Sequence, residues 1–195
     1  MRELERPLTT SWIVAIGLAL AALVVVLIYN GLVRARALVR EGWSGVTVQL
    51  RRRADLIPNL VSSVKGYVEH ERGLLDAVTA RRAEAVQART APEAVRADTA
   101  LDGALGRLMV VAEAYPALKA DQAFLALQAQ LAEIETELQS ARRYYNATVR
   151  DLNTRIATFP ALLIAGPLGF REEPSFTDDD PGLAAAPAVQ FDAAR

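Results

Sequence analysis

An uncharged apolar run near the start of the chain constrains the fold most. Residues 11–29, "SWIVAIGLALAALVVVLIY", carry no acidic or basic side chain. As a helix the run would be about 28 Å long, close to the roughly 30 Å hydrocarbon thickness of a bilayer. Trp12 and Tyr29 stand at its two ends, where interfacial aromatic residues belong. Because the run exceeds the usual apolar core of a signal peptide, we expect an uncleaved transmembrane helix after a short tail, residues 1–10.

The charges on either side of this run favour one orientation. Arg2 and Arg6 precede it, whereas three arginines follow it within eleven residues. The positive-inside rule therefore favours, by a small margin, a cytoplasmic C-terminal body in a bacterial cell membrane. The residues expected to contact lipid are Trp12, Tyr29, Arg34, Arg36 and Arg40. Small residues at helical spacing, as in Ala15-Ala19-Ala22, would also suit helix pairing and a homo-oligomer.

The remainder of the chain shows helical periodicity. Between residues 39 and 159, apolar residues recur every three or four positions in four segments separated by short connections. Thr90 and Asp121 stand where N-caps belong, and Pro160 ends the last pattern. The chain is therefore expected to be all-α, with the transmembrane helix followed by an antiparallel, up-and-down four-helix bundle of long helices over residues 30–160.

Two further segments follow the bundle. Residues 161–176 begin with the apolar "ALLIAGPLGF", and residues 177–195 are rich in acid, alanine and proline. We expect the second of these to be a disordered tail. If the last bundle helix returns towards the membrane, the apolar segment lies near the bilayer. There it would either dip into the interface or close the end of the bundle.

The stretch "VQLRRRADLIPNLVSSVKGYVEHE", residues 48–71, interrupts the apolar pattern. Pro58 breaks or kinks a helix when it lies inside one, but is tolerated in a first turn. We interpret the stretch as a fold-back with Asp55 capping a new helix, the alternative being one kinked helix. The fold-back would put a polar collar at the pole far from the membrane. This collar is the predicted partner-binding surface: Arg51, Arg52, Arg53, Asp55 and Asn59.

Little in the sequence predicts catalysis. Cysteine is absent, and the single histidine, His70, lies between Glu69 and Glu71. "HERGL" has only the first half of the H-E-x-x-H zinc motif, because Leu74 replaces the second histidine. We therefore predict no catalytic residue, no metal site and no cofactor. The formal net charge of −1 gives no electrostatic reason to expect nucleic acid as a partner.

Several motifs together resemble the LemA family of bacterial membrane proteins. They are "YNGLVRARALVREGW", "VQLRRRADLIPNLVSSVKGYVEHE", "LMVVAEAYPALKAD", "ARRYYNATVRDLNTRIATFP" and "LIAGPLGF", in order between Tyr29 and Phe176. The resemblance implies one N-terminal membrane anchor and a cytoplasmic antiparallel helical bundle, with no catalytic residues to carry over. Pro167 departs from the family pattern, which disfavours a regular helix there.

The resulting hypothesis is a membrane-anchored, non-enzymatic interaction or scaffold module with unidentified protein partners. One alternative is a lipid-surface effector that uses the arginines after the span and residues 159–170. The other is a hydrolase that uses Glu69, His70 and Glu71.

Overall fold

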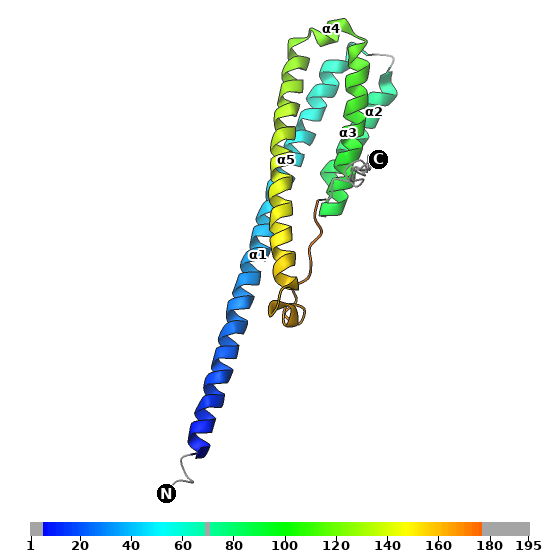
Figure 1. Ribbon diagram of the computed structural model, residues 1–195. Helices are drawn as coiled ribbons and strands as arrows, with labels where there is room; N and C mark the ends of the chain where they lie inside the picture. The colour runs from blue at the N-terminus through cyan, green and yellow to red at the C-terminus, as the bar shows by residue number, and fades with distance from the viewer. Residues whose placement is uncertain (1–5, 69–70, 177–195) are drawn as a thin grey trace, which may run out of the picture.

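The computed structural model describes residues 6–68 and 71–176, and within these ranges the chain forms helices and no strand (Figure 1). The predicted all-α class is confirmed. The elements are α1 (Arg6–Lys65), α2 (Arg72–Gln87), α3 (Ala91–Glu113), α4 (Pro116–Lys119), α5 (Gln122–Ala157) and the 3₁₀ turn η2 (Ala161–Leu163). The expected tail over residues 177–195 and the residues Glu69 and His70 lie outside the described ranges.

Helix α1 is 60 residues long, which corresponds to about 90 Å. Its first half projects from the bundle (Figure 1). The side chains of residues 11–27 along this part are exposed. Within the described residues α1 is the one helix that is long and apolar enough to cross a membrane. Trp12, with 70% of its surface exposed, marks the outer end of this apolar stretch. The second half of α1 enters the bundle without a break.

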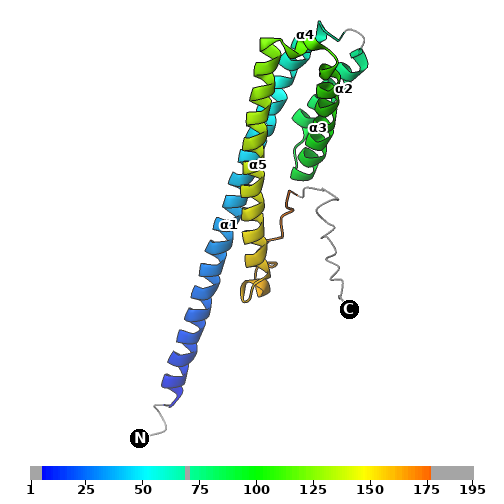
Figure 2. The ribbon, with the colours of Figure 1, turned by 45° about the horizontal axis from the view of Figure 1, so that its top comes forward.

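The bundle has a long pair of helices and a shorter hairpin. Helices α1 and α5 lie antiparallel along most of the length of α5, and the α2–α3 hairpin covers only their upper part (Figures 1 and 2). Two apolar cores result. The upper core joins α1, α2, α3, α4 and α5, and includes Leu60, Val78, Leu108, Leu118 and Phe124. The lower core joins α1 and α5 with residues that follow η2, and includes Leu32, Val46, Leu138, Leu152 and Phe170.

The predicted fold-back at Asp55 is wrong, because α1 continues through Pro58 to Lys65. Proline at position 58 has no N–H to donate to the carbonyl of Ala54, which is buried. The guanidinium of Arg82 on α2 supplies the missing hydrogen bond, with Nε donating to that carbonyl at 2.7 Å. Beyond the proline, Leu60 and Val64 are buried in the upper core, so packing also favours continuation. The chain reverses only after Lys65.

The predicted helix starts at Thr90 and Asp121 are confirmed. Thr90 forms a capping box with Glu93, whose carboxylate accepts from the backbone N–H groups of Arg89 and Thr90. These bonds lower the pKa of Glu93. Asp121 caps α5 by accepting from two backbone N–H groups, and its pKa is lowered by those bonds and by the Tyr67 hydroxyl. Both caps close tight connections, which makes neighbouring helices antiparallel.

Close packing of α1 against α5 requires a glycine at position 42. A Cβ placed on Gly42 would lie 3.1 Å from Cα of Tyr145, so the backbones approach closely here. Gly45, one turn further along α1, is exposed and has no neighbour within 4 Å of such a Cβ. The two glycines therefore differ only in what faces them.

We predict opposite effects of alanine at these two glycines. Gly45→Ala should stabilise the protein by about 0.5–1 kcal/mol, because alanine restricts the unfolded backbone. Gly42→Ala should destabilise it by about 1–3 kcal/mol, because the added methyl group overpacks the α1–α5 contact. Thermal unfolding of the full chain in detergent micelles, followed by circular dichroism, measures both. Shifts in the same direction would contradict the role given to Gly42.

The hydrogen bond that replaces the proline N–H is tested by a double-mutant cycle. Arg82→Met should cost about 1–3 kcal/mol, because it leaves the buried Ala54 carbonyl without a donor. In a Pro58→Ala background the backbone N–H of residue 58 supplies that donor, so the same substitution should cost much less. Chemical unfolding of the four proteins gives the coupling energy. An equal cost in both backgrounds would show that Arg82 does not serve this carbonyl.

Candidate functional site

A partly buried layer of charged residues, with Arg53 and Asp98 at its centre, separates the two apolar cores. On α1, Arg53 lies between Leu50 of the lower core and Ile57 of the upper core. Asp98 occupies the equivalent level on α3, and Glu135 does so on α5. Arg53 is 8% exposed to solvent and Asp98 is 2% exposed. The described bundle is therefore interrupted at one level by ionic contacts.

The geometry of this layer joins three helices. Arg53 Nη1 donates to Asp98 Oδ1 at 3.0 Å and lies 3.3 Å from Glu135 Oε2, while its Nη2 pairs with Asp102. Arg142 on α5 pairs with the other carboxylate oxygen of Asp98. Two guanidinium groups thus face three carboxylates.

Burial and charge act in opposite directions on the ionisation of these groups. Burial lowers the pKa of Arg53, but the Asp102, Asp98 and Glu135 carboxylates outweigh it and leave that pKa raised. Burial raises the pKa of Asp98, against the attraction of Arg53 and Arg142. Both pKa values are therefore raised: the rise favours the charged form of Arg53, which meets three anions, and the protonated form of Asp98, which is buried and meets two cations and two anions. Arg53 is therefore a permanently charged structural residue.

The structure divides the predicted partner-binding residues into two groups. Arg51, Arg52, Asp55 and Asn59 are exposed on α1, whereas Arg53 is buried in the charged layer. None of them lies at the pole, because α1 continues beyond Asn59 to Lys65. The position expected for the polar collar, at the pole far from the membrane, is therefore wrong. Arg53 is also not available on the surface.

Two of the exposed members, Arg52 and Asp55, line a groove between α1 and α5. It has a volume of about 310 Å³. Its lining residues are Arg52, Asp55, Leu56, Gln130, Glu133, Ile134 and Glu137. Arg52 lies 3.6 Å from Glu137, and Gln49 donates to the same carboxylate at 2.8 Å. We call this surface, together with Arg51 and Asn59, the α1–α5 face.

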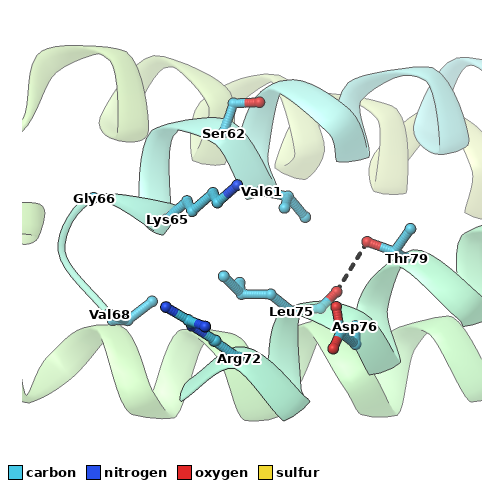
Figure 3. A pocket seen from close by; sticks show the side chains of 9 residues that line it. All are labelled: Val61, Ser62, Lys65, Gly66, Val68, Arg72, Leu75, Asp76 and Thr79. Atoms are coloured by element: carbon cyan, nitrogen blue, oxygen red, sulfur yellow. Dashed lines mark hydrogen bonds between the residues drawn. The ribbon is translucent and has the colours of Figure 1, made fainter. Parts of the chain in front are cut away.

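A larger hollow lies at the far end of the bundle, where α1 ends and α2 begins. Its volume is about 780 Å³, and Lys65 and Arg72 line it together with Asp76, Leu75 and Val68 (Figure 3). Thr79, also on its wall, donates to the Leu75 carbonyl of its own helix at 2.9 Å (Figure 3). Charges of both signs line the hollow and do not converge on one ligand class.

The histidine cluster adds no described site. Glu71 precedes α2, while Glu69 and His70 lie outside the described residues. Among residues 6–68 and 71–176, no group of three histidine, cysteine, aspartate or glutamate side chains is placed to hold a metal ion.

The predicted lipid contacts lie along the lower half of α1. Trp12, Tyr29, Arg34 and Arg40 are exposed. Arg36 differs from them, because its guanidinium carbon lies 4.5 Å from the ring centroid of Phe170. Tyr29 makes an edge-on contact with the same ring, with centroids 5.8 Å apart. Phe170 thereby joins the chain after η2 to the end of the apolar stretch.

The extended residues 171–176, which we call the strap, return along α5 from this point (Figure 2). Asn153 Nδ2 donates to the Glu173 carbonyl at 2.9 Å, and Asn153 Oδ1 accepts from the Glu173 N–H at 3.0 Å. Asn146 makes the same pair of bonds with Phe176, at 2.8 and 2.7 Å. The Phe176 ring then packs on Trp43 and Tyr145.

Sequence analysis missed the charged layer and the function of these two asparagines. Asp98 is one residue from Ala97 and three from Leu101, so it falls on an apolar row of α3, and an acidic residue there signals a buried pair. Asn146 and Asn153 are seven residues apart, about two helical turns, and therefore share a face of α5. Asn146 also begins the sequence Asn146-Ala147-Thr148, which matches a glycosylation sequon, but its side chain is engaged by the Phe176 backbone.

Methionine substitutions distinguish the buried arginine from its exposed neighbour. Arg53→Met should destabilise the full chain by about 3–5 kcal/mol, because three carboxylates lose their shared cation in a buried layer. Arg52→Met removes only an exposed contact and should change stability by less than about 1 kcal/mol. Denaturant unfolding in micelles measures both changes. Equal effects would remove the structural role assigned to Arg53.

Comparison with known proteins agrees with this architecture. The LemA family model matches residues 42–191. MamQ 1 and MamQ 2, magnetosome proteins of Paramagnetospirillum magneticum, are each 25% identical over 180 residues, covering 79% of this chain and 66% of the relative. MamQ of Magnetospirillum gryphiswaldense is 23% identical over 193 residues, covering 85% and 71%. The chain thus spans slightly less than two thirds of the length of the first two relatives. With its apolar N-terminal helix, its helical bundle and a family match over most of its length, this membrane-associated protein belongs to the LemA family.

Proposed function

We propose that this protein is a membrane-tethered, non-enzymatic interaction module that binds other proteins through its α1–α5 face. The observation that carries the proposal is the continuity of α1, which extends from the apolar stretch into both cores. Such a helix holds the bundle at a fixed height. Arg51 lies about 33 Å along α1 from Tyr29, well beyond a Debye length of about 8 Å from the lipid head groups.

The α1–α5 face suits a protein partner for two reasons. The α2–α3 hairpin packs elsewhere on the long pair, so the groove between α1 and α5 is open. Arg51 and Arg52 lie about one helical turn from Asp55, so the surface presents positive and negative charges side by side. A partner with complementary charges can recognise this pattern. Leu56 and Ile134 add apolar area at the bottom of the groove.

The cytoplasmic orientation is part of the proposal. It is supported by Arg34, Arg36 and Arg40, which follow the apolar stretch, against Arg2 and Arg6 before it. Arg34 and Arg40 are exposed on α1 and, within about 8 to 17 Å of Tyr29, can reach anionic head groups. In this proposal these arginines position the module by contacting lipid, and they are not part of the α1–α5 face that binds proteins.

Site-specific photocrosslinking in native membranes tests the docking face. A photoreactive residue at Asn59 should give discrete adducts that include cytoplasmic proteins, and the double charge reversal Arg51→Glu/Arg52→Glu should remove them. The same residue at Arg107, exposed on α3, is the control and should give none of these adducts.

Two results would contradict the proposal. Adducts from Asn59 that survive the double charge reversal would show that the face does not select the partner. Adducts solely with proteins outside the cytoplasm would refute the orientation.

A further inference from the structure

The loop after α5 exposes large apolar side chains beside the end of the transmembrane stretch. We call residues 158–170 the tip. Phe159 is 75% exposed, Leu162 59% and Leu163 65%. They lie close together in sequence, whereas Ala161 and Ala165 of the same loop are buried. The tip therefore has an inner side that joins the lower core and an outer side of exposed apolar residues.

The tip is held in place from both sides. Ala165 and Phe170 pack into the lower core. The strap that follows is held by the paired hydrogen bonds of Asn146 and Asn153. Closing the end of the bundle would place Phe159, Leu162 and Leu163 inside, yet the tip buries Ala161, Ala165 and Phe170 and leaves those three exposed. The exposure of the leucines and of Phe159 is therefore a fixed property of the fold.

The position of the tip identifies what covers it. Phe159 and Pro160 share one groove with Leu27, Ile28 and Gly31 of α1. Leu27 belongs to the apolar stretch that ends at Tyr29, so the tip lies at the level where α1 leaves the hydrocarbon. The exposed apolar surface of α1 thus continues sideways onto the tip. Arg155, which lines the same groove, is a cation at head-group level.

We infer that the tip inserts into the leaflet on the side of the bundle, next to the point where α1 leaves the bilayer. Phe159, Leu162 and Leu163 thereby give the protein a second, in-plane contact with the membrane. Aromatic and leucine side chains on a fixed loop are suited to the boundary between head groups and acyl chains. The inference does not rest on the α1–α5 face, because the tip lies at the opposite end of α5 from Gln130 of that groove.

The absence of cysteine from the chain allows a direct test. Leu162→Cys and Leu163→Cys are made separately in the full chain, labelled with an environment-sensitive fluorophore and reconstituted into phosphatidylcholine–phosphatidylglycerol vesicles at high lipid excess. Val110→Cys is the matched control, because Val110 is an apolar residue of similar exposure, 73%, on α3. Gln128 contacts its neighbour Met109 and lies about 44 Å along α5 from Ala157.

The expected result is a blue-shifted emission at both tip positions and loss of that emission when the vesicles contain lipids with a nitroxide high on the acyl chain. The Val110→Cys label should keep its emission in nitroxide vesicles and lose it with aqueous iodide. Circular dichroism should show unchanged helicity for all three variants.

Two results would overturn the inference. Tip labels that iodide quenches and nitroxide lipid does not would place the tip in water. Tip labels insensitive to both quenchers would show that protein, such as a second copy of the chain, covers the tip.

Discussion

Helix α1 has to satisfy several partners with one continuous backbone, and the rest of the structure depends on this constraint. It supplies the candidate transmembrane stretch, one wall of the lower core and one wall of the upper core. A break at Pro58 would allow the segment that carries Leu60 and Val64 to turn away from the axis of the apolar stretch. Pro58 cannot donate a hydrogen bond to the Ala54 carbonyl, and Arg82 on α2 donates one instead, so this carbonyl is not left unpaired. The α2–α3 hairpin thus stabilises the backbone of α1 as well as its apolar face.

The charged layer and the glycine contact define how the helices align. Buried ion pairs add little net stability, because desolvation offsets their attraction. Their geometry is nevertheless specific: sliding α3 by one turn against α1 would move Asp98 away from Arg53 and place a carboxylate among leucines. Gly42 sets the lower half of a different pair, α1 and α5, by allowing α1 to approach the backbone of Tyr145. Register is thus set by ionic contacts in the middle and by close packing below.

Features that depend on neighbouring residues could be predicted from the sequence, and features that depend on distant partners could not. The apolar stretch, the Thr90 and Asp121 caps and the all-α class follow from local patterns, and the structure agrees with them. The continuity of α1 did not follow, because the group that satisfies Ala54 is 28 residues away on another helix. Arg53 looked like its exposed neighbours for the same reason: its acidic partners lie on α3 and α5.

The docking face shows a similar division. Arg51, Arg52, Arg53, Asp55 and Asn59 were predicted as one polar collar; four of them are exposed and Arg53 is buried, and their binding of a partner stays a prediction. Their position relative to the far pole of the bundle was misjudged, because it depends on where the chain reverses. The strap was beyond sequence reasoning, since an asparagine that pairs with an extended backbone has no periodic signal of its own.

The unbroken α1 also acts as a lever arm. From Tyr29 to Lys65 it extends about 54 Å with no hinge, so any lean of the transmembrane part is carried to the far end. At a typical inclination of about 20°, that end swings sideways by roughly 18 Å. Local thinning or thickening of the bilayer alters this inclination, and with it the reach of the bundle over the membrane plane.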